Sequence, residues 1–381
     1  MVQNLNNFQA KQDELRVNLV SCQTENSGQE VTHEKNKLLR WGMLGTGNAA
    51  NVLAAAIKAS SSGQLVAVAS RDAEVARKFS QKYQVGKSYG SYEELLNDAE
   101  VDVVCIALPH NLHAEWSIKA AQAKKHILCE KPAAIKYGAA LAVIDEVKKQ
   151  NVFYMEGFMY RCHKQTKKLV EILKAKEIGQ IKLIEASFCY HAEYSAEEIA
   201  RKKINGGGGI LDVGCYPVSM ARLIAGIDND VEAIMPLEVQ GMAHVGDESE
   251  YDEWAVANLK FQGDILAQVS TSVSVEHRND LRIFGSKGSI YIPSPWVPGG
   301  AGPGCTSIFI KYTGGREIKE IKVETTIGLY AQEMDTVAEN IQLKQAKEMN
   351  WQDTLCNMKT IELWRNTVGI MGGADSYNFQ N

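Results

Sequence analysis

The sequence predicts an α/β protein whose first part is a doubly wound parallel sheet and whose second part is an α+β domain. The first part is indicated by short, continuously apolar segments that alternate with helix-like segments between residues 38 and 158. Such strands are buried on both faces, as in parallel βαβ units. After residue 158 longer strand-like segments follow one another, which predicts a large, open and mostly antiparallel sheet.

The expected elements of the first domain follow in strict alternation. Apolar strands are predicted at 38–45, 64–70, 101–108, 126–130 and 151–157. Helices are predicted at 48–60, 72–83, 91–98, 111–124 and 136–150. We therefore expect a doubly wound α/β domain over 38–158.

The second domain is expected to be an α+β domain over 159–381. Strands are predicted at 181–192, 252–261, 264–276, 280–292 and 306–312, and helices at 164–175, 328–344 and 351–369. Residues 294–304 form a loop by their Pro and Gly content. The polar segment 1–37 has no periodic pattern and is expected to be a flexible N-terminal arm.

Composition restricts the function classes. The chain has 381 residues, a net charge of −5 and no basic excess, which argues against nucleic-acid binding. No apolar run reaches the ~18 residues of a membrane span, and no secretory signal pattern is present. None of the eight cysteines forms a Cys-x-x-Cys pair, so we expect free thiols in a cytoplasmic protein.

A glycine-rich turn follows the first predicted strand and opens the first helix. The segment 45–50 reads GTGNAA and fits G-x-G-x-x-A. Gly45 permits the tight turn, Gly47 lets a pyrophosphate approach the backbone, and Ala50 allows close packing of helix on strand. The helix N-terminus then offers N–H groups to phosphates, as in a Rossmann fold. The predicted cofactor contacts here are Gly45, Thr46, Gly47, Asn48 and Ala49.

The end of the second strand indicates which dinucleotide binds. NAD enzymes usually place an acid here for the ribose diol, but this chain has Ser70 followed by Arg71. A small hydroxyl and a guanidinium suit a 2′-phosphate, so we expect NADP rather than NAD. The alternative is that Arg71 is a solvated residue at a helix start and that Asp72 binds the ribose.

Two further segments carry residues suited to proton transfer. Lys131, in Glu130-Lys131-Pro132, directly follows a parallel strand, where such sheets bind their ligands. The run Gly206–Gly209 precedes Asp212 and Tyr216, which share a face if the segment is helical. A nearby ammonium would lower the pKa of the tyrosine toward working pH. A salt-bridged lysine, a hydrogen-bonded aspartate and a core tyrosine remain the alternative.

Together these motifs resemble the glucose–fructose oxidoreductase / inositol dehydrogenase / MocA (Gfo/Idh/MocA) family. The resemblance runs from about Leu38 to Gly369 and rests on GTGNAA, LPHNLHAEWSIKAAQAKKHILCEKP, EGFMYR and GGGGILDVGCYPVSMARLIAG. It implies a Rossmann domain joined to an open-faced sheet, used for homodimers or homotetramers. It also implies a nicotinamide-dependent oxidoreductase that acts on sugars, cyclitols or related polyols.

Residue roles carry over from the family motifs. Lys131 matches the lysine held near the nicotinamide, and Asp212 matches the acid of an Asp-x-x-x-His pattern. Position 216 has Tyr216 in place of that histidine, which resembles the branch with dimeric dihydrodiol dehydrogenase and NADP-dependent xylose dehydrogenase, where tyrosine is the acid–base group. The predicted catalytic residues are Lys131, Asp212 and Tyr216, and the substrate residues are these three and Arg161. Further cofactor residues are Ser70, Arg71, Leu108, His113, Glu130 and Lys131.

The sequence also departs from the family. After EGFMYR it continues with Cys162-His163-Lys164 instead of an aromatic residue and His-Pro, and segment 191–205 differs as well. Both would border the substrate pocket, so the substrate stays open. We expect no metal, because His110 and His113 lack a third ligand. Two alternatives to a sugar dehydrogenase are a non-catalytic NADP-sensing regulator of the same fold and an NAD-dependent redox glycosidase.

Overall fold

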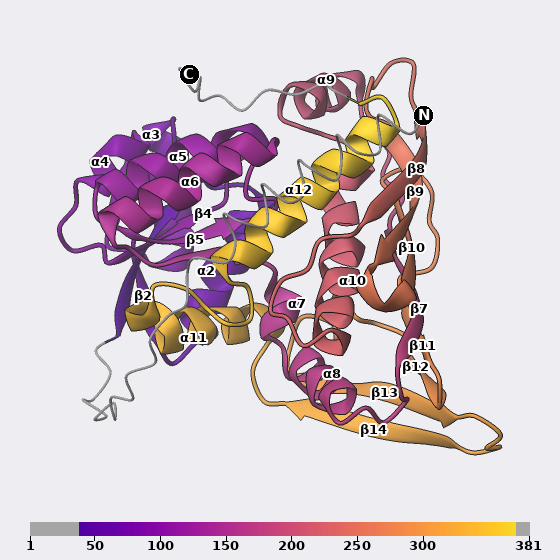
Figure 1. The fold of residues 1–381 in the computed structure, drawn as a ribbon. Helices are drawn as coiled ribbons and strands as arrows, with labels where there is room; N and C mark the ends of the chain where they lie inside the picture. The colour runs from indigo at the N-terminus through magenta and orange to yellow at the C-terminus, as the bar shows by residue number, and fades with distance from the viewer. Residues whose placement is uncertain (1–37, 371–381) are drawn as a thin grey trace. The chain divides into compact units, whose positions relative to one another are not determined.

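The computed structural model describes residues 38–370, apart from the side chains of residues 200 and 201. The expected N-terminal arm, 1–37, lies outside the described residues, as does the end of the chain from residue 371. The described part contains a parallel sheet and a mixed sheet, with helices packed on both (Figure 1). The predicted fold class is therefore confirmed.

The first sheet has six parallel strands in the order β3-β2-β1-β4-β5-β6. This order reverses beside β1, which places the ligand crevice of a doubly wound sheet at the carboxyl ends of β1 and β4. The strands are β1 (Leu39–Leu44), β2 (Gly63–Ala69), β3 (Lys87–Tyr89), β4 (Val103–Ile106), β5 (His126–Glu130) and β6 (Tyr154–Gly157). The helices are α2 (Asn48–Ala59), α3 (Ala73–Tyr83), α4 (Tyr92–Leu96), α5 (His110–Gln122) and α6 (Tyr137–Gln150).

The second sheet has eight strands in the order β14-β13-β12-β11-β7-β10-β9-β8. Only the β7–β10 pair is parallel, so the expectation of a mostly antiparallel sheet is confirmed. The strands are β7 (Ile181–Cys189), β8 (Glu238–Val245), β9 (Asp252–Phe261), β10 (Ile265–Ser272), β11 (Leu281–Gly285), β12 (Gly288–Ile292), β13 (Gly304–Tyr312) and β14 (Ile318–Thr325).

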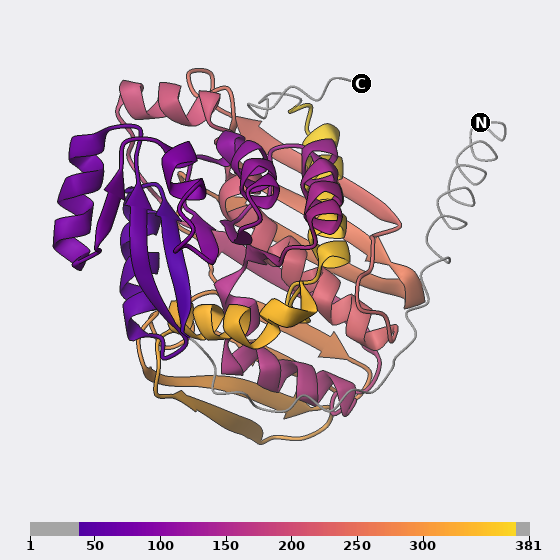
Figure 2. The same ribbon diagram turned by 90° about the vertical axis from the view of Figure 1, so that its left-hand side faces the viewer.

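Helices cover one face of this sheet (Figures 1 and 2). Helix α10 packs on β7 and β10, α8 packs on β13 and β14, and α12 packs on β8. Helix α12 also contacts α6, and α11 contacts α2, so the last two helices join the two sheets. The helices of this part are α7 (Met159–Cys162), α8 (Lys164–Lys174), α9 (Ala196–Ile204), α10 (Cys215–Asp228), α11 (Leu329–Asn340) and α12 (Trp351–Thr367), with 3-10 turns at Gln262–Asp264 and Ile341–Leu343.

Several element predictions need correction. The strand predicted over 280–292 is a hairpin, because the chain reverses between β11 and β12 after Gly285. The strand predicted over 264–276 ends at Ser272. The sequence analysis missed β3, β8 and β14, which are short or highly exposed strands with little apolar signal. It also predicted no helix at α7, α9 or α10.

The stretch from Ile210 to Asp228 is the one described helix that is long and apolar enough to cross a membrane. The apolar segment of this stretch is 83% buried within the protein. The stretch forms the π-helical turn Ile210–Gly214 and α10. A core helix can have the same length and apolar composition, and the packing of α10 on β7 and β10 accounts for the composition here.

Candidate active site

The glycine-rich turn after β1 has the geometry of a dinucleotide site. Gly45 has a φ of +105°, and a Cβ there would lie 2.4 Å from the carbonyl oxygen of Ala107 at the end of β4. At Gly47, by contrast, a Cβ would meet no atom within 4 Å, so this side of the turn is open. Gly47 begins α2 without a side-chain cap, which leaves the first turn of the helix to a phosphate. These residues fit a dinucleotide.

The three residues that follow β2 have different settings. The Asp72 carboxylate caps α3, because it accepts hydrogen bonds from the backbone N–H groups of Glu74 at 2.8 Å and Val75 at 3.2 Å. Ser70 is buried, whereas Arg71 is exposed. The carboxylate that could bind a ribose diol is therefore engaged in the helix cap, and the guanidinium is exposed to solvent.

His113 joins the two loops that follow β4 and β5. Its side chain is buried, with Nδ1 2.7 Å from the carbonyl oxygen of Pro132 and Nε2 2.8 Å from that of Leu108. Burial lowers the pKa of His113, although both carbonyls oppose the change. The Leu108 side chain in turn lies against the Gly45 turn. His113 thus positions the loops, because both of its ring nitrogens already face the backbone.

The centre of the site is an ion pair between the two domains. The Nζ of Lys131, which follows β5, donates to the backbone carbonyl of Asp212 at 2.6 Å and lies 3.2 Å from its Oδ1. Burial opposes the charge on Lys131, but the Asp212 carboxylate outweighs it and raises the lysine pKa. Burial likewise opposes the charge on Asp212, but Lys131, His110 and Lys202 lower its pKa. Both groups are ionised at neutral pH.

Two residues that the sequence analysis did not select lie beside this ion pair. The hydroxyl of Tyr190, just after β7, donates to Asp212 Oδ2 at 2.6 Å and lies 3.1 Å from the hydroxyl of Tyr194. Lys202, on α9, has its Nζ 3.8 Å from the same carboxylate oxygen. Burial and the Asp212 charge raise the pKa of Tyr190, so its hydroxyl stays protonated. For Lys202 the only sequence signal was that the segment containing it, 191–205, departs from the family pattern. Tyr190 lies just before that segment and had no such signal.

A cavity of about 380 Å³ opens directly beside Asp212. Its size is within the range of small-molecule sites. The cavity lies between the start of α5 and the segment that contains α9, and its lining residues are Pro109, His110, Tyr194, Glu198, Lys202, Asn205, Gly206, Gly207 and Asp212. Burial lowers the pKa of His110 to about 4, so this ring is neutral at neutral pH. Six of its nine lining residues have side chains that can hydrogen-bond to hydroxyl groups, although most of the lining surface is apolar.

The glycine run positions the carboxylate of this site. Gly208 has a φ of +109°, and a Cβ there would lie 2.3 Å from Oδ1 of Asp252. Oδ2 of Asp252 accepts a hydrogen bond from the N–H of Ile210 at 2.6 Å. Glycine is therefore required at 208, because the buried Asp252 holds the backbone of the π-helical turn that carries Asp212.

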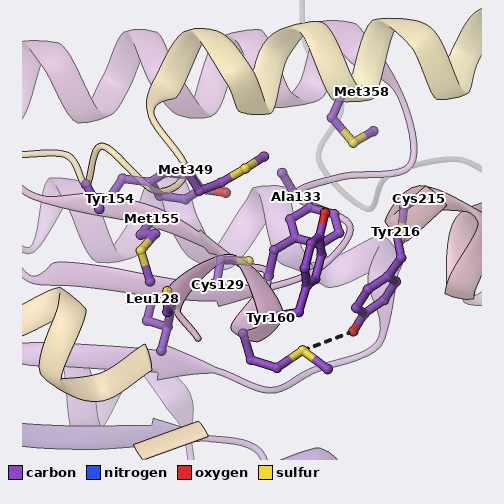
Figure 3. Close-up of a cluster of buried hydrophobic side chains, with 14 of the residues drawn as sticks. Leu128, Cys129, Ala133, Tyr154, Met155, Tyr160, Cys215, Tyr216, Met349 and Met358 are labelled. Carbon is purple, nitrogen blue, oxygen red and sulfur yellow. Dashed lines mark hydrogen bonds between the residues drawn. The ribbon is translucent and has the colours of Figure 1, made fainter. Parts of the chain in front are cut away.

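The side chain of Tyr216 is buried. Its hydroxyl donates to the sulfur of Met159 at 3.4 Å, as the dashed line in Figure 3 shows. The ring packs among aromatic residues, with Phe188 at 5.0 Å and Phe158 at 5.3 Å between ring centroids. The Lys131 ammonium lies 5.2 Å from the centroid of the Tyr216 ring. The predicted lowering of the tyrosine pKa is wrong, because burial raises it well above its usual value.

Arg161 does not reach the cavity. Its buried guanidinium pairs with Asp353, and it also donates to the carbonyl of Glu348 at 3.0 Å and that of Ser219 at 3.1 Å. Arg222 pairs with the same Asp353 carboxylate at 2.7 Å. Arg161 therefore holds α7 against α12, and the structure corrects its expected role in substrate binding.

The remaining predicted groups have less specific settings. Glu130 precedes Lys131, and burial raises its pKa while the Lys131 charge opposes the rise. Among residues 38–370, no cluster of three or more His, Cys, Asp or Glu side chains could hold a metal ion. The seven cysteines that the structure describes are free thiols, and all but Cys305 are buried.

Comparisons with protein families match most of the described chain. Residues 39–158 match the Gfo/Idh/MocA "oxidoreductase family, NAD-binding Rossmann fold", and residues 166–291 match the "GFO/IDH/MocA C-terminal domain". A trans-1,2-dihydrobenzene-1,2-diol dehydrogenase from Xenopus tropicalis is 33% identical over 262 residues, which is 68% of this chain and 77% of that protein. A D-xylose 1-dehydrogenase (NADP(+)) from Haloferax volcanii is 37% identical over 51% of this chain and 60% of that protein.

Solved structures share the fold at low sequence identity. A 3-ketoreductase from Actinomadura kijaniata, in complex with NADP and TDP-benzene, gives a TM-score of 0.77 at 23% identity, over 90% of this chain and all of that one. An aldose–aldose oxidoreductase from Caulobacter crescentus gives 0.75 at 20% identity, over 87% of this chain and 98% of that one.

Proposed function

Because the chain belongs to the Gfo/Idh/MocA family of NAD(P)-dependent oxidoreductases, we propose that it is an NADP(H)-dependent dehydrogenase or reductase of sugars or related polyols. The observation that carries this proposal is the Lys131–Asp212 pair, which joins the carboxyl edge of the parallel sheet to the cavity beside Asp212. Ligands of doubly wound sheets bind at this edge. The two relatives above are named for a diol and for a sugar.

The glycine turn Gly45–Ala50 and the exposed Arg71 would hold the dinucleotide. When bound, the nicotinamide supplies the site that accepts or releases a hydride. The helix-capping role of Asp72 supports NADP over NAD, because the one carboxylate among residues 70–72 is already engaged through its Oδ1. The naming of the Haloferax volcanii relative for NADP(+) also supports this cofactor.

Residues of the chain would bind the substrate hydroxyls and transfer the proton of the reacting one. The ionised Asp212 would accept a hydrogen bond from one substrate hydroxyl, and Lys131 would donate to the oxygen of the reacting carbon. In our assignment, Tyr216 would exchange the proton of the hydroxyl on the reacting carbon. Burial keeps its phenol protonated, which suits proton donation to a forming alkoxide. Met159 would have to release the hydroxyl for this step.

We also propose a homodimer or homotetramer formed through the uncovered face of the second sheet. Met242, Trp254, Val256 and Leu266 expose large apolar side chains there, on the adjacent strands β8, β9 and β10. A run of apolar side chains on an open sheet face is typical of an interaction surface. Sedimentation of the wild type and of Val256→Lys should show an oligomer and its dissociation.

The test of function is NADP⁺ reduction, followed by nicotinamide absorbance, with a panel of aldoses, inositols and trans-diols and with NAD⁺ in parallel. We expect turnover of a polyhydroxylated substrate with NADP⁺. Binding of NADPH without turnover of any alcohol or of the matching ketones would instead support a regulator. Substrate cleavage without net nicotinamide reduction would support a redox glycosidase.

A further inference from the structure

The cavity beside Asp212 contains more polar groups than the transfer of one proton needs. Helix α9 contributes Glu198 and Lys202, which are four residues apart and both line the cavity. Tyr194 and Asn205 flank this helix in the sequence and also line the cavity. These groups lie beyond the Lys131–Asp212 pair, where they would face the part of a substrate that does not react.

Lys202 is placed to bind a substrate group rather than to complete the ion pair. Its Nζ is 3.8 Å from Asp212 Oδ2, which exceeds hydrogen-bond length, while Tyr190 donates to the same oxygen at 2.6 Å. The ammonium lies 4.5 Å from the centroid of the Tyr194 ring, and the side chain is 31% exposed. A substrate hydroxyl could therefore reach the ammonium without breaking a short bond.

The helix that carries Lys202 is fixed at both ends. At its start, Glu198 accepts from the hydroxyl of Ser195 at 2.8 Å and from its N–H at 3.0 Å, as in a capping box. Just beyond its end, Nδ1 of His110 lies 2.9 Å from the carbonyl of Gly206. The position of α9 over the cavity is thus determined by specific contacts on both sides.

We propose that Lys202, together with the Tyr194 hydroxyl, determines substrate specificity by holding hydroxyl groups beyond the reacting carbon. The preferred substrate is then a polyhydroxylated sugar rather than a trans-diol on a hydrocarbon ring. A hydrocarbon ring would cover the Lys202 ammonium without offering it an acceptor, and a buried polar group left without a partner is strongly disfavoured. The Tyr194 hydroxyl would lose only a substrate partner, because the Tyr190 hydroxyl lies 3.1 Å from it. This inference rests on the proposed function and concerns the same cavity.

The experiment compares Lys202→Met with Lys203→Met on two substrates. Lys203 is the neighbouring residue on α9 but pairs with Glu250 at 2.5 Å and does not line the cavity, so its variant controls for loss of charge and for folding. The substrates are D-xylose and trans-cyclohexane-1,2-diol, measured with NADP⁺. For Lys202→Met we expect the KM for D-xylose to rise about tenfold to a hundredfold, as for a lost hydrogen bond to a charge, with kcat within threefold. The kcat/KM for the cyclohexanediol should not change, and Lys203→Met should match the wild type.

The outcomes separate this inference from the proposed function. If the wild type reduces NADP⁺ with neither substrate nor any other of the panel, the proposed function itself fails. If it oxidises D-xylose and Lys202→Met leaves that KM unchanged, the specificity role is overturned while the function stands. An equal loss with both substrates, or a fall in kcat alone, would place Lys202 in the Lys131–Asp212 cluster and also overturn it. Lys202→Arg, which keeps the donor, should restore at least part of the affinity.

Discussion

The Nζ of Lys131 lies 2.6 Å from the backbone carbonyl oxygen of Asp212, although the two residues are 81 positions apart and lie against different sheets. One follows a parallel strand, and the other lies in a π-helical turn packed on the second sheet. The contact therefore exists only when both halves of the chain are folded and docked. A reaction that needs this lysine and this carboxylate together therefore depends on the docking of the two domains.

Replacing Lys131 by Met should abolish turnover without affecting the dinucleotide site. The variant removes the donor to the reacting oxygen and the strongest charge that keeps Asp212 ionised. We expect kcat to fall at least ~100-fold, the size of a positioned acid–base or donor group. The dissociation constant for NADPH, measured by fluorescence, should stay within threefold. Lys149→Met, an exposed change on α6, is the control, and a Lys131→Met enzyme with normal kcat would refute the assignment.

The two tyrosines near Lys131 can be distinguished by comparing Tyr216→Phe with Tyr190→Phe. If Tyr216 exchanges the proton, its variant loses at least ~100-fold in kcat at every pH. Tyr190→Phe should retain most of the activity but move the acid limb of the kcat/KM profile to higher pH, because the Tyr190 bond helps to lower the Asp212 pKa. The reverse ranking of the two variants would assign proton exchange to Tyr190.

Arg71→Ala tests the cofactor preference. A guanidinium that binds a 2′-phosphate contributes a charge-assisted hydrogen bond, so the KM for NADP⁺ should rise about tenfold to a hundredfold. The KM for NAD⁺ should change by less than twofold. Arg77→Ala on α3 removes an equally exposed guanidinium that pairs with Glu74, and it should affect neither cofactor. Equal effects of Arg71→Ala on both cofactors would remove the basis for NADP selectivity.

Arg161→Ala should destabilise the protein and leave substrate affinity unchanged. The variant leaves Arg222 as the remaining ion-pair partner of the buried Asp353 within the described chain. Breaking a buried pair costs about 3 kcal/mol or more, measurable by urea denaturation. The KM of the folded fraction should stay within twofold. An increased KM at unchanged stability would return Arg161 to the substrate site.

Asp252 gives a pH dependence of stability. Burial raises its pKa to about 7, although the hydrogen bond from the N–H of Ile210 opposes the rise. The unfolded chain has an aspartate pKa of about 3.9, so between pH ~4 and 7 the folded protein holds a proton that the unfolded chain releases. This contribution to stability is therefore present below the unfolded pKa and is lost as the pH rises through about 7.

Comparison with Asp252→Asn isolates this term. The difference in the free energy of unfolding, wild type minus Asp252→Asn, should decrease between pH 5 and pH 8. Asp264→Asn, at an exposed turn, serves as the control and should give a constant difference. A difference that does not vary with pH for Asp252→Asn would show that this carboxyl does not titrate in that range.

The sequence alone determined the parallel sheet, the glycine turn and the position of Lys131 at a strand end. Each depends on short-range signals: apolar runs bounded by turns, a glycine spacing, and a residue directly after a strand. It also identified Asp212 beside a glycine run, and the structure supplies the reason, since Gly208 lies against Asp252. For these features the local chain carries the information.

The tertiary structure alone decided which side chains meet. Tyr190 and Lys202 reach Asp212 because β7 and α9 are folded back beside the π-helical turn, and no spacing in the sequence encodes that approach. Arg161 has the residue type of a substrate ligand, but its guanidinium forms an ion pair with Asp353, nearly two hundred positions away. Tyr216 is buried among rings contributed by other segments, so its pKa rises where sequence reasoning expected it to fall. Burial and charge pairing depend on the whole fold, and a pKa or a ligand role follows from them rather than from the residue type.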